Sequence, residues 1–272
     1  MIQLIAIDLD GTLLRNDKTL SEANREAVRW ATEQDVEVVI CSGRPLSGVL
    51  PLVSKLGLDQ AGQHSIIFNG GAVVDNATAT IIQQTTLAPA EVERIADALL
   101  MSDLPADAVS AKQAFHFEAV PGWPSTYPER TPYLTFSDWK RQKAPCLPIY
   151  KVVATTTKEH LSACMARIPE FLFTEYAVVR SQEYQLEIMP KAVNKGAAVE
   201  ALADHLGIPM RAVMAIGDEE NDQTMLKKAG MAVVMANGNP SMKAIADYVT
   251  LTNEEDGVGI AIRQFVTPKE RR

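Results

Sequence analysis

The sequence predicts an α/β fold, in which a doubly wound, Rossmann-like core with a mostly parallel sheet is interrupted by an inserted α+β domain. Short apolar runs alternate with amphipathic helical stretches over residues 2–68, and the same alternation resumes after residue 194. Unbroken apolar runs suit strands that are buried on both faces, as in a parallel sheet. The residues between these two stretches do not show this regular alternation. We therefore expect a core domain of residues 1–83 and 191–272, and an inserted domain of residues 84–190.

The first part of the core reads as β-α-β-α-β. An apolar run at 2–7 ends in Asp8, and a helical stretch follows from Ser21, a good N-cap residue, to Gln34. The later elements of this part are a strand at 36–40, a helix at 46–56, a strand at 65–68 and a hairpin at 72–75 and 80–85. Alternating strands and helices of this kind are typical of a doubly wound sheet.

The inserted region has fewer clear signals. A helix is expected at 89–101, followed by a stretch rich in proline and aromatic residues to which no strand is assigned. The pattern then predicts a strand at 149–154, a helix at 157–168 and strands at 176–181 and 184–189. This order indicates an α+β domain with a mostly antiparallel sheet.

The second part of the core opens with a helix that is expected to begin at residues 194–196. Its further elements are expected to be a strand at 212–216, a helix at 221–229, a strand at 231–235, a helix after Pro240, a strand at 248–251 and a helix near 257–266.

Composition excludes several classes of function. The 272 residues carry a formal net charge of −8, and no dense run of lysine and arginine stands out, so nucleic acid is not an expected partner. No apolar run reaches the length of about 18 residues that a membrane-spanning helix needs, and no signal peptide is expected at the N-terminus. Three cysteines without a metal-ligand spacing favour a reducing, cytoplasmic location.

Two carboxylates follow the first predicted strand, in the segment Asp8-Leu9-Asp10-Gly11-Thr12. Ligands bind at the carboxyl ends of the strands in an open α/β sheet, and Gly11 gives the chain freedom to turn there. Both carboxylates could then point into one crevice. The structural alternative is an ordinary Asp-Gly turn, with the first Asp capping a neighbouring element.

A second acidic segment, at residues 217–222, follows another buried strand. It places Asp218 and Asp222 at the same edge of the sheet as Asp8. Hard divalent cations such as Mg²⁺ prefer oxygen ligands, often one or two carboxylates together with waters and a substrate phosphate. The structural alternative for this segment alone is a cap that opens the next helix.

Two further segments have a pattern suited to phosphate. Ser42 and Arg44 follow the second strand, where a hydroxyl and a helix N-terminus can meet an anion, although Pro45 could simply mark a helix start. Lys195 opens a helix, where its charge opposes the helix dipole. This unfavourable placement indicates an anionic ligand, with solvation of the helix end as the alternative.

Together, these four segments resemble the four motifs of the haloacid dehalogenase superfamily, and their spacing resembles the Cof-type branch, class IIB, which includes bacterial sugar-phosphate phosphatases. The segments at 69–71 and 186–188 also resemble Cof-type elements. Only 29 residues separate Thr12 from Ser42, whereas 150 separate Arg44 from Lys195. The resemblance therefore implies a cap domain inserted after the second motif.

The resemblance implies a phosphatase with Mg²⁺ as its cofactor. Asp8 would be the nucleophile and Asp10 the general acid and base. Mg²⁺ would be bound by Asp8, the Asp10 carbonyl and Asp218. The residues expected to bind the phosphoryl group are Ser42, Gly43, Arg44, Lys195 and Asn221. Those expected to support the site are Thr12, Asn69 and Asp222.

The expected substrate is a small phosphorylated metabolite, which the cap would select. The candidate residues for this selection, each of which could equally serve packing, are His116, Trp123, Tyr127 and Glu187.

A phosphomutase remains an alternative. Acidic residues outnumber basic ones in 84–190, which disfavours a second phosphate site, but Lys140, Arg141 and Lys143 leave it open. A non-catalytic sugar-phosphate sensor is the second alternative. We expect no membrane partner and a monomer or homodimer.

Overall fold

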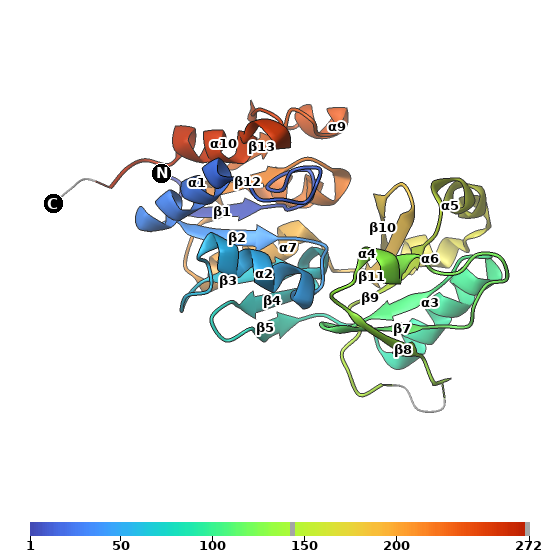
Figure 1. Ribbon diagram of the computed structural model, residues 1–272. Coiled ribbons are helices and arrows are strands. Elements are labelled where there is room, and N and C mark those ends of the chain that lie inside the picture. Colours follow the sequence, from blue (N-terminus) through green and yellow to red (C-terminus); the bar gives the residue numbers. More distant parts are fainter. Residues whose placement is uncertain (142–144, 270–272) are drawn as a thin grey trace. The chain divides into compact units, whose positions relative to one another are not determined.

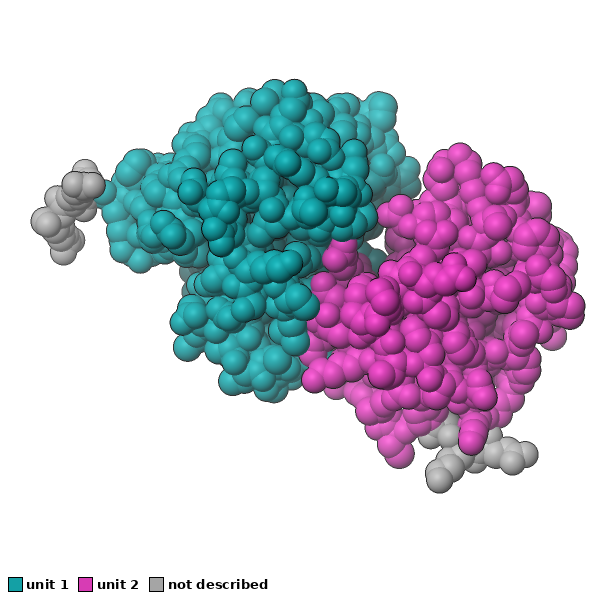
Figure 2. Space-filling model, viewed as in Figure 1, with its two compact units in different colours: residues 1–42, 49–83, 194–272 teal, residues 43–48, 84–193 magenta. Residues whose placement is uncertain are grey.

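The computed structural model describes residues 1–141 and 145–269 and divides into two compact units, coloured separately in Figure 2. Unit 1 contains residues 1–42, 49–83 and the chain from Asn194 onward, and unit 2 contains residues 43–48 and 84–193. Each unit is described by itself. The domain limits expected from the sequence, 84 and 190, stay a prediction.

Unit 1 is built on an eight-stranded sheet whose strands run in the order β14-β13-β12-β1-β2-β3-β4-β5 (Figure 1). All described pairings from β14 to β3 are parallel, and β4 runs antiparallel to β3. The strands are β1 (Leu4–Ile7), β2 (Glu37–Cys41), β3 (His64–Ile67), β4 (Ala72–Asp75), β5 (Thr80–Gln84), β12 (Val213–Gly217), β13 (Met231–Val234) and β14 (Tyr248–Val249).

Helices cover this sheet on both faces, as its two-sided burial requires. Side chains of α7 and α8 pack on one face against Leu4, Ala6 and Val39, while α1 packs beside α10. The helices are α1 (Glu22–Glu33), α2 (Leu46–Leu56), α7 (Lys195–His205), α8 (Gln223–Lys228), α9 (Pro240–Lys243) and α10 (Gly257–Phe265). The predicted cap of α1 is confirmed, because Ser21 Oγ accepts a hydrogen bond from Asn24 N at 3.1 Å.

The strand order has one consequence for function. From β1 the chain adds β2 and β3 on one side, and β12 and β13 lie on the other side, so the order reverses between β1 and β12. Crevices for ligands form at such a reversal, outside the carboxyl ends of the strands. Asp8 and Asp218 are the residues that directly follow β1 and β12.

Unit 2 contains a six-stranded sheet with the order β10-β11-β9-β6-β7-β8. Every described pairing is antiparallel except that of β7 with β8, so the predicted α+β character is confirmed. Its elements are α3 (Pro89–Met101), β6 (Asp107–Val109), β7 (Gln113–His116), α4 (Tyr127–Arg130), β8 (Thr135–Asp138), β9 (Lys151–Thr155), α5 (Lys158–Cys164), α6 (Glu170–Glu175), β10 (Tyr176–Gln182) and β11 (Gln185–Pro190).

The predicted fold class is confirmed, but three strands of unit 2 were missed. Strands β6, β7 and β8 have only three or four residues each. Segments this short show too few alternations to reveal a period, and pairing with β9 and with one another defines them.

Two helices differ from their expected limits. The helix expected at 157–168 ends at Cys164, and the one expected at 221–229 starts as a 3₁₀ turn, Glu220–Asp222. Among the described residues, no helix is both long and apolar enough to span a membrane.

Candidate active site

The first motif lies where β1 ends in the middle of the sheet. The Asp8 amide donates a hydrogen bond to Ile216 O at 3.0 Å, which continues the pairing of β1 with β12 up to the acid itself. Gly11 then turns the chain with φ at +89°, and a Cβ atom there would lie 2.4 Å from Asp218 Oδ2. Any side chain at this position would therefore displace Asp218, so glycine is required by both the backbone angle and the close approach.

Lys195 joins the first motif to the last. Its side chain is fully buried, and Nζ donates to Asp8 Oδ1 at 2.5 Å and to Asp222 Oδ1 at 2.6 Å. Asn194 caps the helix that Lys195 opens, since its side-chain oxygen accepts from Ala197 N at 2.8 Å. Two carboxylates thus offset the unfavourable position of a lysine at a helix N-terminus.

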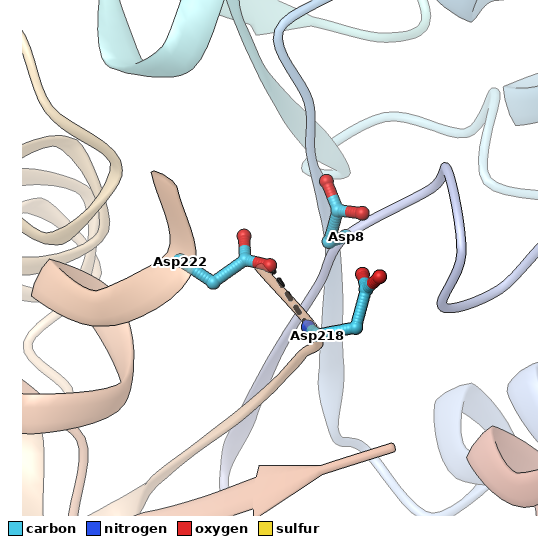
Figure 3. A group of neighbouring side chains, drawn as sticks. All are labelled: Asp8, Asp218 and Asp222. Atoms are coloured by element: carbon cyan, nitrogen blue, oxygen red, sulfur yellow. Dashed lines mark hydrogen bonds between the residues drawn. The ribbon is translucent and has the colours of Figure 1, made fainter. Parts of the chain in front are cut away.

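Asp218 and Asp222 complete an acidic group with Asp8, shown in Figure 3, in which ligand oxygens of the three lie within 4.8 Å of one another. Thr12 Oγ1 donates to Asp218 Oδ1 at 2.7 Å. Asp222 Oδ2 accepts from the Asp218 amide at 2.9 Å and from the Glu219 amide at 3.1 Å. Asp222 is therefore engaged through both oxygens, one with Lys195 and the other with the backbone.

Burial and like charges raise the pKa values of Asp8 and Asp218. Burial raises the pKa of Asp8 well above its usual value, and the charges of Asp222 and Asp218 raise it further against the opposing effect of Lys195. The pKa of Asp218 is raised to about 7, first by burial and then by the charge of Asp222. Burial alone would lower the pKa of Lys195, but Asp222 and Asp8 raise it above its ordinary value, so the ammonium stays charged.

The acidic group suits a divalent cation. Its three buried carboxylates face a single lysine, so the ionised group has an excess of two negative charges. The donors are all oxygen, as a hard cation such as Mg²⁺ prefers. Asp8 and Asp218 are the better ligands, because the oxygens of Asp222 are engaged by Lys195 and by two backbone amides.

Polar groups from two further segments, at Ser42 and at residues 68–70, also lie in unit 1. Ser42 is buried at the end of β2, and its carbonyl accepts from the Asn69 amide at 3.0 Å. Asn69 Oδ1 accepts from Asn221 Nδ2 at 3.2 Å, so these two predicted residues are brought together. The backbone is strained at Phe68, whose φ angle is +53°, whereas the following Asn69 and Gly70, at +56° and +100°, are residue types that accept a positive φ. Such strain persists where the surrounding structure enforces it, often at functional sites.

The remaining predicted residues are Gly43, Arg44 and Asp10. Gly43 and Arg44 belong to unit 2, whereas Ser42 belongs to unit 1. The Asp10 side chain is paired with Lys18, with Nζ 2.8 Å from Oδ1. Lys18 was missed, as was Asn237, whose side chain donates to Gly11 O at 2.8 Å. Both lie outside the four motifs, and no local pattern marks them.

The four candidate residues of the inserted region all belong to unit 2, where each has a packing or pairing partner. His116 Nδ1 contacts the buried Asp107 carboxylate, a hydrogen bond that raises the pKa of His116. Trp123 stacks on His160 with ring centroids 3.7 Å apart. Tyr127 is buried, and Glu187 forms a buried pair with Lys151 at 3.0 Å. The part that these four candidate residues play in substrate selection stays a prediction.

Comparison with known families gives the classification. The family model of the haloacid dehalogenase-like hydrolases matches residues 5–262, which are nearly all of the chain and include every segment of the cluster. The chain is a haloacid dehalogenase-like hydrolase. The resemblance inferred from the four motifs is therefore confirmed.

Relatives of this hydrolase agree on the class of enzyme. A Streptococcus pyogenes relative, provisionally named a phosphatase, is 35% identical over 97% of this chain and 98% of its own. A 5-amino-6-(5-phospho-D-ribitylamino)uracil phosphatase of Bacillus subtilis is 31% identical over 97% of this chain and 96% of its own. The predicted class, a phosphatase, is confirmed.

Solved structures of the family share the fold. A haloacid dehalogenase-like hydrolase from Bacteroides thetaiotaomicron superimposes with a TM-score of 0.85 at 27% identity, covering 98% of this chain and all of that one. A sugar phosphatase of subclass IIB gives a TM-score of 0.78 at 21% identity, over 97% of this chain and 98% of that one. The second match establishes a common fold.

Proposed function

We propose that this hydrolase is a magnesium-dependent phosphatase of small phosphorylated metabolites, sugar phosphates among them, which works through a phosphate ester on Asp8. The observation that carries the proposal is the position of the Asp8 carboxylate, buried at the end of the central strand between Lys195 and Asp218. A nucleophile needs a cation to offset charge as it meets an anionic phosphate, and a second acid to handle protons. Lys195 and Asp10 supply these functions.

In the first step an Asp8 oxygen attacks phosphorus, and the bond from phosphorus to the ester oxygen breaks. Asp10 gives its proton to the departing alcohol, which is the role of a general acid. Lys195 and the side chains of Ser42 and Asn221 would bind the phosphoryl oxygens. Their hydrogen bonds favour the transition state because they are preformed in a buried site.

In the second step a water molecule attacks the phosphorus of the Asp8 ester. The bond from phosphorus to the Asp8 oxygen breaks, phosphate leaves, and the carboxylate is restored. Asp10, now a carboxylate, takes the proton from the water. Two easier steps thus replace one difficult hydrolysis, which is the general advantage of covalent catalysis.

Asp8, Asp218 and the Asp10 carbonyl would hold Mg²⁺, with Asp222 and Thr12 keeping the lysine and Asp218 in place. When bound, Mg²⁺ offsets the repulsion between carboxylate and phosphate and stabilises charge on the transferring group. Chelation with EDTA is expected to abolish phosphate release from p-nitrophenyl phosphate, and added Mg²⁺ to restore it. Full activity in EDTA would contradict the proposal.

Mg²⁺ binding should be stronger at pH 8 than at pH 6. The pKa of Asp218 in the folded protein is about 7, so at pH 6 the metal must displace a proton. We expect an affinity about tenfold lower at pH 6, the equivalent of one pKa unit. Because the folded state binds this proton more tightly than the unfolded state, the metal-free protein also loses stability as pH rises from about 4 to about 7.

Thermal melts with and without Mg²⁺ at pH 6 and pH 8 measure this dependence. The metal should raise the melting temperature more at pH 8. Asp218→Asn is the control, since it removes the titrating carboxyl and should abolish the metal-induced shift at both values. Equal shifts at both pH values in the wild-type protein would contradict the assignment of Asp218.

Two lines of support narrow the substrate class. A structural relative is named a sugar phosphatase, and a sequence relative is named for a phosphate on a ribityl chain. One name gives a sugar phosphate and the other a phosphate on a ribityl group, so we expect the substrate to carry its phosphate on a carbon skeleton with several hydroxyl groups. Phosphate release from a panel of about 80 phosphorylated metabolites would identify it. Preference for phosphoproteins or nucleic-acid ends would contradict the proposal.

The phosphomutase alternative is disfavoured by how cations are paired in unit 2. Arg141 pairs with Asp97 at 2.6 Å and Glu118 at 3.3 Å, and Lys151 pairs with Glu187. Lys143 lies outside the described residues. Incubation with a hexose 1-phosphate decides between the two: a hydrolase releases phosphate, whereas hexose 6-phosphate as the only product would establish a mutase. Absence of release across the panel would favour the sensor.

A cytoplasmic location and a monomeric or homodimeric state stay predictions. The three cysteines, Cys41, Cys146 and Cys164, are free. Burial raises the pKa of the Cys41 thiol to about 12, so this side chain next to the site is expected to stay protonated.

A further inference from the structure

The backbone of the first motif folds into a tight turn over residues 8–14, here called the motif turn. The Leu13 amide donates to Asp8 O at 3.2 Å, and the Leu14 amide donates to Leu9 O at 2.9 Å. These amides therefore find partners within the turn. The carbonyl groups on its other side need partners from elsewhere, because a buried carbonyl without a hydrogen bond is costly.

Three asparagine side chains from other segments supply these partners, and together they are called the asparagine clamp. Each amide nitrogen donates to one carbonyl of the motif turn. The three bonds are Asn24 Nδ2 to Leu13 O at 3.2 Å, Asn237 Nδ2 to Gly11 O at 2.8 Å and Asn253 Nδ2 to Leu14 O at 3.0 Å. Asn24 and Asn253 are buried, whereas Asn237 is exposed. They come from α1, from the loop after β13 and from the 3₁₀ turn Asn253–Glu255, so three separate segments hold the motif turn.

Further hydrogen bonds orient the amides of the clamp. Asn24 Oδ1 accepts from Gly259 N at 2.8 Å, and Asn237 Oδ1 accepts from Asn253 N at 3.0 Å. Because the oxygen of each of these two side chains receives a backbone N–H, its nitrogen is the atom that faces the motif turn. The donors of the clamp are therefore aimed at the carbonyls before any ligand binds.

Every expected Mg²⁺ ligand depends on the motif turn. The Asp8 side chain and the Asp10 carbonyl belong to it, and Thr12 within it holds Asp218, since Thr12 Oγ1 donates to Asp218 Oδ1 at 2.7 Å. Gly11 packs so closely that a Cβ there would lie 2.4 Å from Asp218 Oδ2. A metal site tolerates ligand distances only within about 0.2 Å, so a small shift of this turn would weaken binding.

We infer that Asn24, Asn237 and Asn253 are positioning residues for the metal, an inference that rests on the proposed function. They act through the carbonyls of the motif turn and not as ligands. Loss of one amide leaves a carbonyl of the turn without its partner, and the turn then gains conformations in which the ligands are misplaced. Groups that orient metal ligands typically contribute about 10-fold to 100-fold to the affinity.

Calorimetric titration of the protein with Mg²⁺ at pH 8 measures this role. We expect Asn253→Ala to raise the Kd for Mg²⁺ about tenfold. Asn237→Ala should raise it about threefold, because water can replace an exposed hydrogen bond in part. With saturating Mg²⁺, kcat for p-nitrophenyl phosphate should fall less than about threefold in both variants, since bound metal restores the ligand geometry.

Asn76→Ala is the matched control for the buried variant. Asn76 is a buried asparagine of unit 1 whose Nδ2 donates to Leu58 O at 2.9 Å, so the change removes the same kind of bond outside the motif turn. It should lower the melting temperature but leave the Kd for Mg²⁺ within about twofold of wild type. Asn237→Ala, at an exposed position, decides the question if Asn253→Ala does not fold.

Wild-type affinity for Mg²⁺ in either clamp variant would overturn the inference, as would an equal rise of Kd in Asn76→Ala. The proposed function has a separate test. It fails if the wild-type enzyme shows no magnesium-dependent release of phosphate, whereas an active wild-type enzyme whose clamp variants bind Mg²⁺ normally removes only the role of the asparagines.

Discussion

Replacing Asp8 by Asn is expected to lower kcat by about 10⁴-fold or more, as removal of a nucleophile does in other enzymes that use covalent catalysis. The amide has nearly the same shape as the carboxylate but is not a competent nucleophile, so no ester can form. It also loses the anionic oxygen that faces Lys195 at 2.5 Å. Release of phosphate from p-nitrophenyl phosphate with saturating Mg²⁺ measures the effect.

Asp35→Asn provides the matched control for this variant. Asp35 is exposed and has a φ angle of +61°, a conformation that asparagine adopts readily, so the same chemical change should leave activity intact. Circular dichroism would verify that both variants are folded. If Asp8→Asn kept more than a few per cent of wild-type kcat, the covalent route through Asp8 would have to be abandoned.

Replacing Lys195 by Met should damage both folding and activity. Lys195 is the one cation in hydrogen-bond contact with both Asp8 and Asp222 among the contacts described, and its side chain is fully buried. Removing one partner of a buried ion pair leaves uncompensated charge, at a cost of about 3–5 kcal/mol. We expect this loss in the free energy of unfolding without Mg²⁺, measured by urea denaturation at pH 8. Activity should fall at least about 100-fold.

Lys228→Met is the control for Lys195→Met. Lys228 pairs with Glu200 on the surface, with side chains 39% and 45% exposed, and such pairs contribute little to stability. Added Mg²⁺ should return part of the lost stability to Lys195→Met, because a divalent cation can offset the same carboxylates. A variant as stable as wild type at pH 8 without metal would mean that the carboxylates are not charged there.

The positions of Asp8 and Asp218 at strand ends could be predicted from the sequence, because they follow from local patterns. Asp8 and Asp218 each come directly after an unbroken apolar run, and parallel strands bring their carboxyl ends to one edge. The contacts Thr12 to Asp218 and Asn69 to Asn221 link segments that the motifs had singled out separately. The pair of Lys18 with Asp10 was not predicted, because it depends on the conformation of residues 11–18, which hydrogen bonds from Asn237 and Asn253 hold in place.

In the inserted region, too, local sequence located some of the elements but not others. Helix α3 and strands β9 and β11 have enough residues to display a period, so the pattern located them. Strand β8 is four residues long and largely exposed, and it exists because it pairs with β7. Local sequence does not encode such a partner.

By itself, the sequence determined the fold class, the family and the identity of the acids and the lysine, because each depends on residue types and on periodicity along the chain. Only the tertiary structure decided that Lys195 joins Asp8 to Asp222, that the pKa of Asp218 rises to about 7, and that Lys18 pairs with Asp10. The physical reason is that burial and charge proximity arise between segments up to about 200 residues apart, as between Thr12 and Asp218. Their strength depends on distances that no local pattern specifies.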